Sequence, residues 1–178
     1  AAMIQPGQTV IFDSGTTTAA AAASARERNV PFTAVTNDLA IGSMLSGNAA
    51  IHTTVTGGYV RPGSSTLLGA GAMQTLSRLR ADLAFIGTHA LTGETLSDTS
   101  IELAEIKSTI LHAADRIVLL AGSGKFFSTS FCTFGRLVDV HLVITDDKLP
   151  PEHAAVIRAL GVPVETVESA PAGLRGVA

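Results

Sequence analysis

Short apolar segments alternate with helix-like segments along almost the whole chain, and this alternation limits the possible folds more than any other feature. The apolar segments, which we expect to be strands, are residues 9–13, 32–36, 50–55, 83–86, 117–121, 142–145 and 162–167. The helix-like segments between them are residues 16–28, 38–45, 72–80, 99–114 and 151–160. Strands that are apolar on both faces are typical of a parallel sheet covered by helices on both sides. The sequence therefore predicts a three-layer α/β domain with a mainly parallel sheet.

The residue types at the helix ends fit this pattern. Asp38 is the expected N-cap of the second helix, and Asp98 or Thr99 that of the fourth, because these side chains accept hydrogen bonds from a helix's first N–H groups. Pro151 suits the first position of the last helix. Residues 122–125, Gly-Ser-Gly-Lys, are expected to form a loop after the strand at 117–121.

The composition indicates a globular domain without a DNA-binding face. With 178 residues the chain favours a single domain, residues 1–178. It is 46% hydrophobic and only 15% charged, which excludes a disordered chain. The net charge of -3 argues against a duplex-DNA reader within these residues, since such proteins carry a basic face. So few charged side chains also predict a buried subunit interface, and hence a homo-oligomer.

Several other functions lack a sequence signal. Cys132 is the single cysteine, so neither an internal disulfide nor a multi-cysteine metal site is expected, which fits a reducing cytoplasm. We expect Cys132 to lie in the core. The five histidines show no metal-site spacing, and no cofactor motif is present. No apolar run approaches the roughly 20 residues that span a bilayer, and the start does not resemble a secretion signal.

The strongest candidate for a binding site lies between the first strand and the first helix, in the segment Asp13-Ser14-Gly15-Thr16-Thr17-Thr18. In open parallel sheets, ligands bind beyond the carboxyl ends of the strands. The glycine lets the backbone approach a ligand, and the free N–H groups of a helix start attract an anion. Four hydroxyl groups at one helix start therefore favour a phosphate or a carboxylate. Ordinary N-capping, which needs one hydroxyl, is the alternative.

Weaker candidates follow along the chain. The first is the run Thr36-Asn37-Asp38 at the end of the second strand, where ligand contact and a simple Asp38 cap are equally plausible. Gly57-Gly58 is expected to form a turn near Arg61. The guanidinium group of Arg61 could bind an anion through two hydrogen bonds, or it could lie free on the surface. Lys125 would present an ammonium group from its loop, and Lys107, taken alone, is a solvated helix residue. His89, in a glycine-bounded loop, could line a pocket.

A set of strings in register carries a family resemblance. They are VIFDSGTTT (10–18), VTND (35–38), GGYVR (57–61), DLAFIG (82–87), AEIK (104–107), GSGKF (122–126) and VITD (143–146). In this order they resemble the C-terminal effector domain of DeoR-family bacterial transcription regulators. The resemblance covers about residues 4–167. Each string alone is weak, but the combination is specific.

The resemblance implies a fold, a function and a set of site residues. The fold would be similar to that of ribose-5-phosphate isomerase, glucosamine-6-phosphate deaminase and CoA-transferase. The domain would sense a phosphorylated sugar, and a winged helix-turn-helix preceding it, absent from this chain, would bind operator DNA, usually as a repressor. The implied effector-binding residues are Asp13, Ser14, Gly15, Thr16, Thr17, Thr18, Thr36, Asn37, Asp38, Gly57, Gly58, Arg61, Lys107 and Lys125.

The sequence departs from the family pattern near the two lysines. Gly122 and Gly124 replace an acidic and a small polar residue of the usual DSSK-like loop, and Leu103 replaces a glutamate four residues before Lys107. These departures concern the identity of the effector more than the fold. The alternative function is a sugar-phosphate isomerase or deaminase of the same fold. Isomerisation needs a carboxylate base over the substrate, yet the stretch comparable to the isomerases' acidic string, residues 82–87, is apolar after Asp82.

Overall fold

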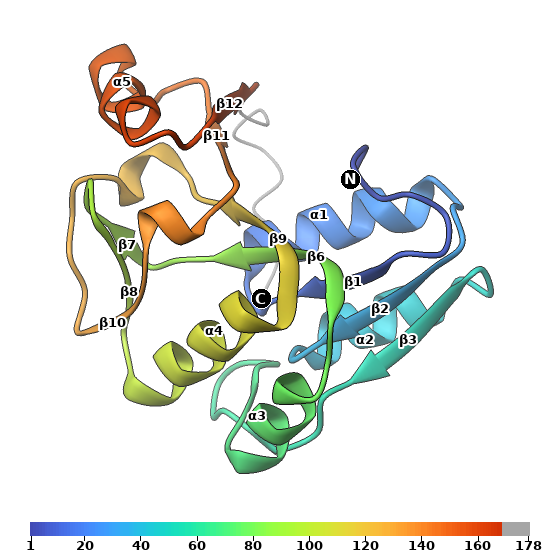
Figure 1. Ribbon diagram of the computed structural model, residues 1–178. Helices are drawn as coiled ribbons and strands as arrows, with labels where there is room; N and C mark the ends of the chain where they lie inside the picture. Colours follow the sequence, from blue (N-terminus) through green and yellow to red (C-terminus); the bar gives the residue numbers. More distant parts are fainter. Residues whose placement is uncertain (169–178) are drawn as a thin grey trace.

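A seven-stranded parallel sheet forms the centre of the computed structural model, which describes residues 1–168 (Figure 1). The predicted domain's last residues, 169–178, lie outside the described residues. The strands of the sheet are β1 (Thr9–Phe12), β2 (Phe32–Thr36), β3 (Ile51–Val55), β6 (Ala81–Gly87), β9 (Ala114–Leu120), β11 (Leu142–Asp146) and β12 (Val164–Val167). Their order is β12-β11-β9-β6-β1-β2-β3, and every neighbouring pair is parallel.

Helices cover both faces of this sheet and enclose two apolar cores. The helices are α1 (Thr16–Glu27), α2 (Leu39–Ser46), α3 (Ala70–Ser77), α4 (Ile101–Ala113) and α5 (Pro151–Ala159). One core contains buried residues of α1 and α2, among them Ala22 and Ile41. The other contains buried residues of α3, α4 and α5, among them Leu76, Ile110 and Ile157. The three-layer α/β fold expected from the sequence is confirmed.

Shorter elements were not expected. A three-stranded antiparallel sheet joins β7 (Ala90–Leu91), β8 (Thr95–Asp98) and β10 (Cys132–Arg136), and a small hairpin pairs β4 (Tyr59–Val60) with β5 (Leu67–Leu68). Within residues 1–168 there are two 3₁₀ turns, η1 (Ser123–Lys125) in the expected loop and η2 (Leu137–Asp139). Strands of two residues are too short to show a pattern, and β8 (TLSD) and β10 (CTFGR) contain polar residues or glycine and lack the continuous apolar run that marks the strands of the large sheet.

The helix caps give one confirmation and one correction. The carboxylate of Asp38 caps α2, since its Oδ1 accepts from the N–H groups of Ala40 and Ile41 at 2.9 and 3.1 Å. The cap expected at Asp98 or Thr99 was wrong. Ser100 caps α4 instead, accepting from the N–H of Leu103 at 3.3 Å, because Asp98 still belongs to β8.

Two further findings concern single features of the chain. Cys132 is half-buried in β10, and it packs against the edge of the core instead of lying inside it. No helix within residues 1–168 has the length and apolar character needed to cross a bilayer.

Candidate functional site

A cavity of about 220 Å³ lies at the carboxyl ends of β1 and β6, beside the starts of α1 and α4. It brings together many residues that the sequence singled out, namely Ser14, Gly15, Thr16, Thr17, Thr18, Arg61, His89, Lys107 and Lys125. The remaining lining residues are Thr66, Gly87, Thr88, Asp98 and Leu103. This position agrees with the rule that ligands of parallel sheets bind beyond the carboxyl ends of the strands.

The start of α1 reaches this cavity without a capping side chain. Its N-cap residue is Gly15, whose φ of 130° lies in a region that residues with a Cβ rarely adopt. The buried hydroxyl of Thr18 donates to the carbonyl of Gly15 at 2.8 Å, and no side chain within residues 1–168 accepts from the first N–H groups of α1 as a cap. Among the described helices, α1 shares the lack of a capping side chain with α3 and α5, but of these three helix starts it alone lines the cavity. The first N–H groups of α1 remain available to an anion.

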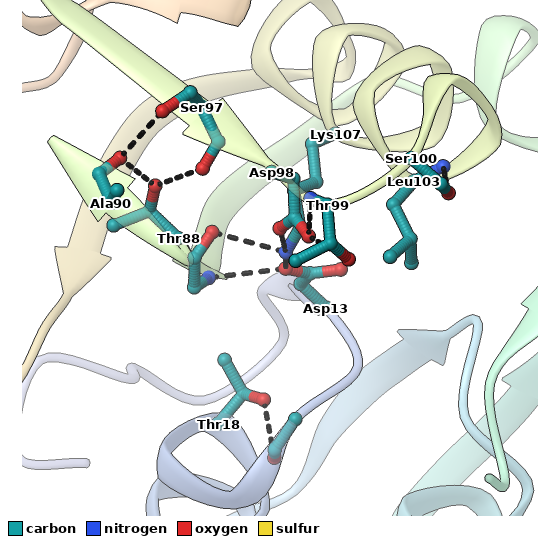
Figure 2. Close-up of polar contacts among 12 residues, drawn as sticks. Asp13, Thr18, Thr88, Ala90, Ser97, Asp98, Thr99, Ser100, Leu103 and Lys107 are labelled. Atoms are coloured by element: carbon teal, nitrogen blue, oxygen red, sulfur yellow. Dashed lines mark hydrogen bonds and ion pairs between the residues drawn. The ribbon is translucent and has the colours of Figure 1, made fainter. Parts of the chain in front are cut away.

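Lys107 is buried and holds several elements together. Its side chain is only 5% exposed, and its Nζ forms ion pairs with Asp13 and, at 3.6 Å, with Asp98 (Figure 2). The same Nζ donates to the carbonyl of Gly87 at 3.0 Å, and the N–H of Gly87 donates to Asp13 at 3.1 Å. Lys107 thereby links α4 to the ends of β1, β6 and β8. Lys107 is therefore not the solvated helix residue that its position in the sequence, taken alone, predicts.

Asp13 lies beneath the cavity surface and is fully buried. One carboxylate oxygen, Oδ2, receives the bonds from Lys107 and Gly87. The other, Oδ1, has no hydrogen-bond partner among the described residues. A buried carboxylate is stable only when it is paired, so Asp13 and Lys107 depend on each other.

Lys125 supplies a second cation to the cavity, from the loop that follows β9. It is half-buried in η1, and its Nζ donates to the carbonyl of Thr88 at 2.6 Å. Burial, followed by the charge of Lys107, lowers the pKa of Lys125 below its ordinary value, while Asp98 and Asp13 act in the opposite direction. A carbonyl is a weaker partner for an ammonium group than an anion is, so a bound anion would compete well for Lys125.

The other predicted site residues do not line this cavity. The hydroxyl of Thr36 accepts from the N–H of Asp38 at 3.1 Å, and Asp38 also accepts from the hydroxyl of Ser65 at 2.8 Å. Asn37 is buried, and its amide has no side-chain hydrogen bond among the described residues. These three residues shape the turn from β2 into α2. As effector contacts they remain a prediction.

Gly57 and Gly58 also lie outside the cavity lining, and their role is to allow a tight backbone turn. Both have positive φ values, 78° and 105°. A Cβ on Gly58 would lie 2.2 Å from the carbonyl oxygen of Leu68, so only glycine fits there. The turn leads into the β4–β5 hairpin, whose connecting loop carries Arg61 to the cavity.

Comparison with known proteins assigns the chain to a family. The profile of the DeoR C-terminal sensor domain matches residues 1–147. The chain belongs to the DeoR sensor-domain family. It is 33% identical to the HTH-type transcriptional regulator GlpR of Haloferax volcanii over 163 residues, which are 89% of this chain and 62% of that protein. It is 29% identical to the HTH-type transcriptional repressor GlcR of Bacillus subtilis over 150 residues, 84% of this chain and 57% of that protein.

The DeoR domain thus spans about three fifths of the length of these relatives, which are named as regulators of transcription and not as enzymes. Among solved structures, the chain is similar to ribose 5-phosphate isomerase A from Methanocaldococcus jannaschii. The TM-score is 0.48 at 15% identity, covering 70% of this chain and 49% of that one.

The DeoR-type loop around Lys125 keeps a carboxylate nearby despite Gly122. Asp146, at the end of β11, accepts from the N–H of Ser123 at 2.7 Å, and its Oδ2 lies 3.4 Å from where a Cβ on Gly122 would be. Burial raises the pKa of Asp146, but hydrogen bonds from Ser123 and the N–H of Lys148 hold it below its ordinary value. Asp146 therefore stays ionised and fixes the start of the loop.

Sequence reasoning missed part of the cavity wall. Gly87 ends β6 and Thr88 follows it, so the rule that pointed to residues 13–18 could have found them. The sequence indicates Asp98 only as a possible cap, because the short strand β8 that carries it has no continuous apolar run. Leu103 was noticed only as a departure from the family pattern.

Proposed function

We propose that this chain is the effector-sensing domain of a transcription regulator and that its cavity binds a phosphorylated sugar. The observation that carries the proposal is the uncapped start of α1, which faces the same cavity as Lys125. Free N–H groups and the positive end of a helix attract an anion, and an ammonium group adds a full charge. The phosphate would lie on residues 15–18 and the sugar among the polar groups of the cavity wall.

The cavity offers less to an enzyme. An isomerase needs a carboxylate that is free to take a proton from the substrate. The carboxylates of Asp13 and Asp98 are both paired with Lys107, and Asp13 lies beneath the cavity surface. These contacts favour a binding site over a catalytic one. Incubation with ribose 5-phosphate or glucosamine 6-phosphate should therefore give no product, and measurable turnover would favour the enzyme.

Calorimetry against pairs of sugar phosphates and free sugars tests the site directly. We expect the phosphate to bind more tightly, and Lys125→Ala to weaken it by about 10- to 100-fold, because a charged hydrogen bond contributes roughly 1.5–3 kcal/mol. The free sugar should be affected much less. Lys148→Ala, which removes an exposed lysine from another loop, should leave both affinities unchanged. Equal weakening of sugar and sugar phosphate by Lys125→Ala would contradict the anion site.

The affinity for a sugar phosphate should also depend on pH. The protonated amine of Lys125 is the form that attracts phosphate, and its pKa is lowered by burial and by Lys107. Affinity should therefore fall as the pH rises through this lowered pKa, at a lower pH than for an ordinary lysine, and binding should take up protons. Calorimetry between pH 7 and pH 10 measures this. An arginine stays charged over this pH range, so the Lys125→Arg variant should not lose affinity for the sugar phosphate as the pH rises. An equal loss of affinity in that variant would show that the pH dependence does not come from Lys125.

The whole protein would couple this site to DNA. In the proposal, a winged helix-turn-helix outside this chain binds operator DNA, usually as a repressor, and the sugar phosphate changes that binding. We propose that the protein acts in the cytoplasm, where its DNA is, and that it forms a homo-oligomer. Large exposed apolar side chains such as Phe131, Tyr59 and Ile101 are available for a subunit interface.

A further inference from the structure

The outer edge of β3 is unpaired within residues 1–168. β3 is the last strand of the large sheet, and it pairs with β2 alone (Figure 1). Directly after β3, the N–H of Thr56 donates to the carbonyl of Thr36 on β2 at 3.0 Å. Because the backbone groups of successive strand residues point to opposite sides, the N–H and C=O groups of Thr53 and Val55 point away from β2. Such an edge can pair with a further strand.

The part of the chain that forms this edge is almost free of charge. No residue between Asp38 and Arg61, or between Arg61 and Arg78, is an aspartate, glutamate, lysine or arginine, although 15% of the chain is charged. These stretches contain α2, β3, β4, β5 and α3. Natural edge strands are usually protected by charged side chains or by proline. The sequence of β3, Ile-His-Thr-Thr-Val, has no lysine, carboxylate or proline.

The opposite edge of the sheet differs in charge. There, β12 carries the exposed Glu165 and lies between Pro163 and the exposed Glu168. The net charge of the chain is -3, so two copies would repel each other at an acidic edge and could meet without repulsion at an uncharged one. The exposed residues of α2, which packs against β3, are uncharged as well. This charge distribution favours β3 as the edge that meets a second copy.

We propose that two copies of this chain pair through β3, in an antiparallel ladder in which Thr53 lies opposite Thr53 of the second copy. In this register Ile51 lies opposite Val55, and His52 lies opposite Thr54. An apolar β-branched residue therefore faces another one, and a polar residue faces a polar one, which are favourable cross-strand pairs. The arrangement is two-fold symmetric and uses the same surface on both copies.

The hydrogen-bonding groups of β3 fit this register. The N–H and C=O of Thr53 can exchange two hydrogen bonds with those of the second Thr53, since both point outward. The N–H of Val55 can reach the carbonyl of Ile51 in the other copy. The N–H of Ile51 already donates to the carbonyl of Asn48 at 3.0 Å and is not available. The symmetric ladder therefore uses the donors of Thr53 and Val55 from each copy.

The side chain of Thr53 gives an independent reason for a partner strand. Its hydroxyl oxygen is buried, and it has no hydrogen-bond partner among the described residues. A buried hydroxyl without a partner is unfavourable. Side chains directly opposite each other in an antiparallel pair lie on the same face, with their Cβ atoms about 5 Å apart. The two Thr53 hydroxyls could therefore bond to each other.

Sedimentation equilibrium with Thr53→Pro tests the pairing. Proline removes the N–H that would cross the interface, and because this N–H points away from β2, the bonds inside the sheet remain. We expect the wild type to form a dimer and the variant to dissociate at least about 10-fold more readily. Thr166→Pro in β12 is the matched control. The N–H of Val143 donates to Pro163 at 2.9 Å, so the N–H of Thr166 also points outward, and this variant should dimerise normally.

A second variant and a second measurement protect the test against a folding defect. His52→Lys changes an exposed side chain, and the two new ammonium groups would lie diagonally across the ladder, about 8 Å apart, so it should also weaken the dimer by about 10-fold or more. Circular dichroism shows whether each variant is folded. In hydrogen exchange, the amides of Thr53 and Val55 should be protected in the dimer and unprotected after dilution to the monomer, whereas the amide of Thr166 should exchange equally in both.

This inference specifies the interface of the homo-oligomer in the proposed function, and it is independent of the effector because β3 does not line the cavity. A dimer that tolerates His52→Lys and leaves the amide of Thr53 unprotected would show that the copies meet elsewhere, and the proposed homo-oligomer would stand. A dimer weakened by Thr166→Pro alone would place the interface at β12 and overturn the pairing through β3. A chain that remains a monomer would overturn both the pairing and the homo-oligomer, while binding of a sugar phosphate would still be decided by calorimetry.

Discussion

Thr16→Asp should abolish binding of a sugar phosphate, with at least a 100-fold loss of affinity, and leave the fold intact. Thr16 is exposed at the first position of α1 and lines the cavity, so the new carboxylate would lie where the phosphate is expected. Two like charges about 4 Å apart repel by roughly 4 kcal/mol near a protein surface, which exceeds the 2.7 kcal/mol or so of a 100-fold change. A carboxylate in a helix's first turn is otherwise stabilising by about 0.3–1 kcal/mol.

Calorimetry measures the loss of sugar-phosphate binding, and thermal unfolding shows whether the fold is intact. Thr16→Asn is the matched control, because it has nearly the same shape as the aspartate without its charge. We expect the asparagine variant to bind within a few-fold of the wild type. The aspartate variant should unfold at the same temperature as the wild type or slightly above it. Retained binding in Thr16→Asp would mean that the phosphate lies elsewhere in the cavity.

The sequence predicted the frame of this domain because that frame depends on local patterns. Strand segments that are buried on both faces must be apolar, so the buried parts of β1, β6 and β9, residues 10–12, 83–86 and 117–120, stand out as short apolar runs. The strand–glycine–hydroxyl pattern at residues 13–18 likewise pointed to a helix start at the carboxyl edge of the sheet. Both features can be read within ten residues of sequence.

The ion pair between Asp13 and Lys107 beneath the cavity, in contrast, cannot be predicted from any short stretch of sequence. Asp13 and Lys107 are 94 residues apart, and only the fold brings α4 against the ends of β1 and β6. Taken alone, the sequence around Lys107 therefore indicates a solvated helix residue, and only the family resemblance implies a role for it in the site. Leu103 presents the same difficulty, because its place in the apolar stripe of α4 does not reveal that it also reaches the cavity.

Lys107→Met should lower the free energy of unfolding by about 3–5 kcal/mol, the cost of removing one partner of a buried ion pair. Methionine keeps the length and the apolar stem of the side chain, so the loss would come from leaving Asp13 and Asp98, both buried, without their cation. Urea unfolding measures the change. Lys148→Met, at an exposed lysine, should stay within about 0.5 kcal/mol of the wild type.

A second variant separates charge from packing at the same position. If the uncompensated carboxylate causes the loss, adding Asp13→Asn to Lys107→Met should recover part of the stability, because a buried amide costs less than a buried charge. If the methionine itself packs badly, the double variant should be no more stable than Lys107→Met alone. A single Lys107→Met variant as stable as the wild type would contradict the ion pair's role. Lys107 would then be free to bind the effector, and the cavity would hold two available lysines opposite α1 instead of one.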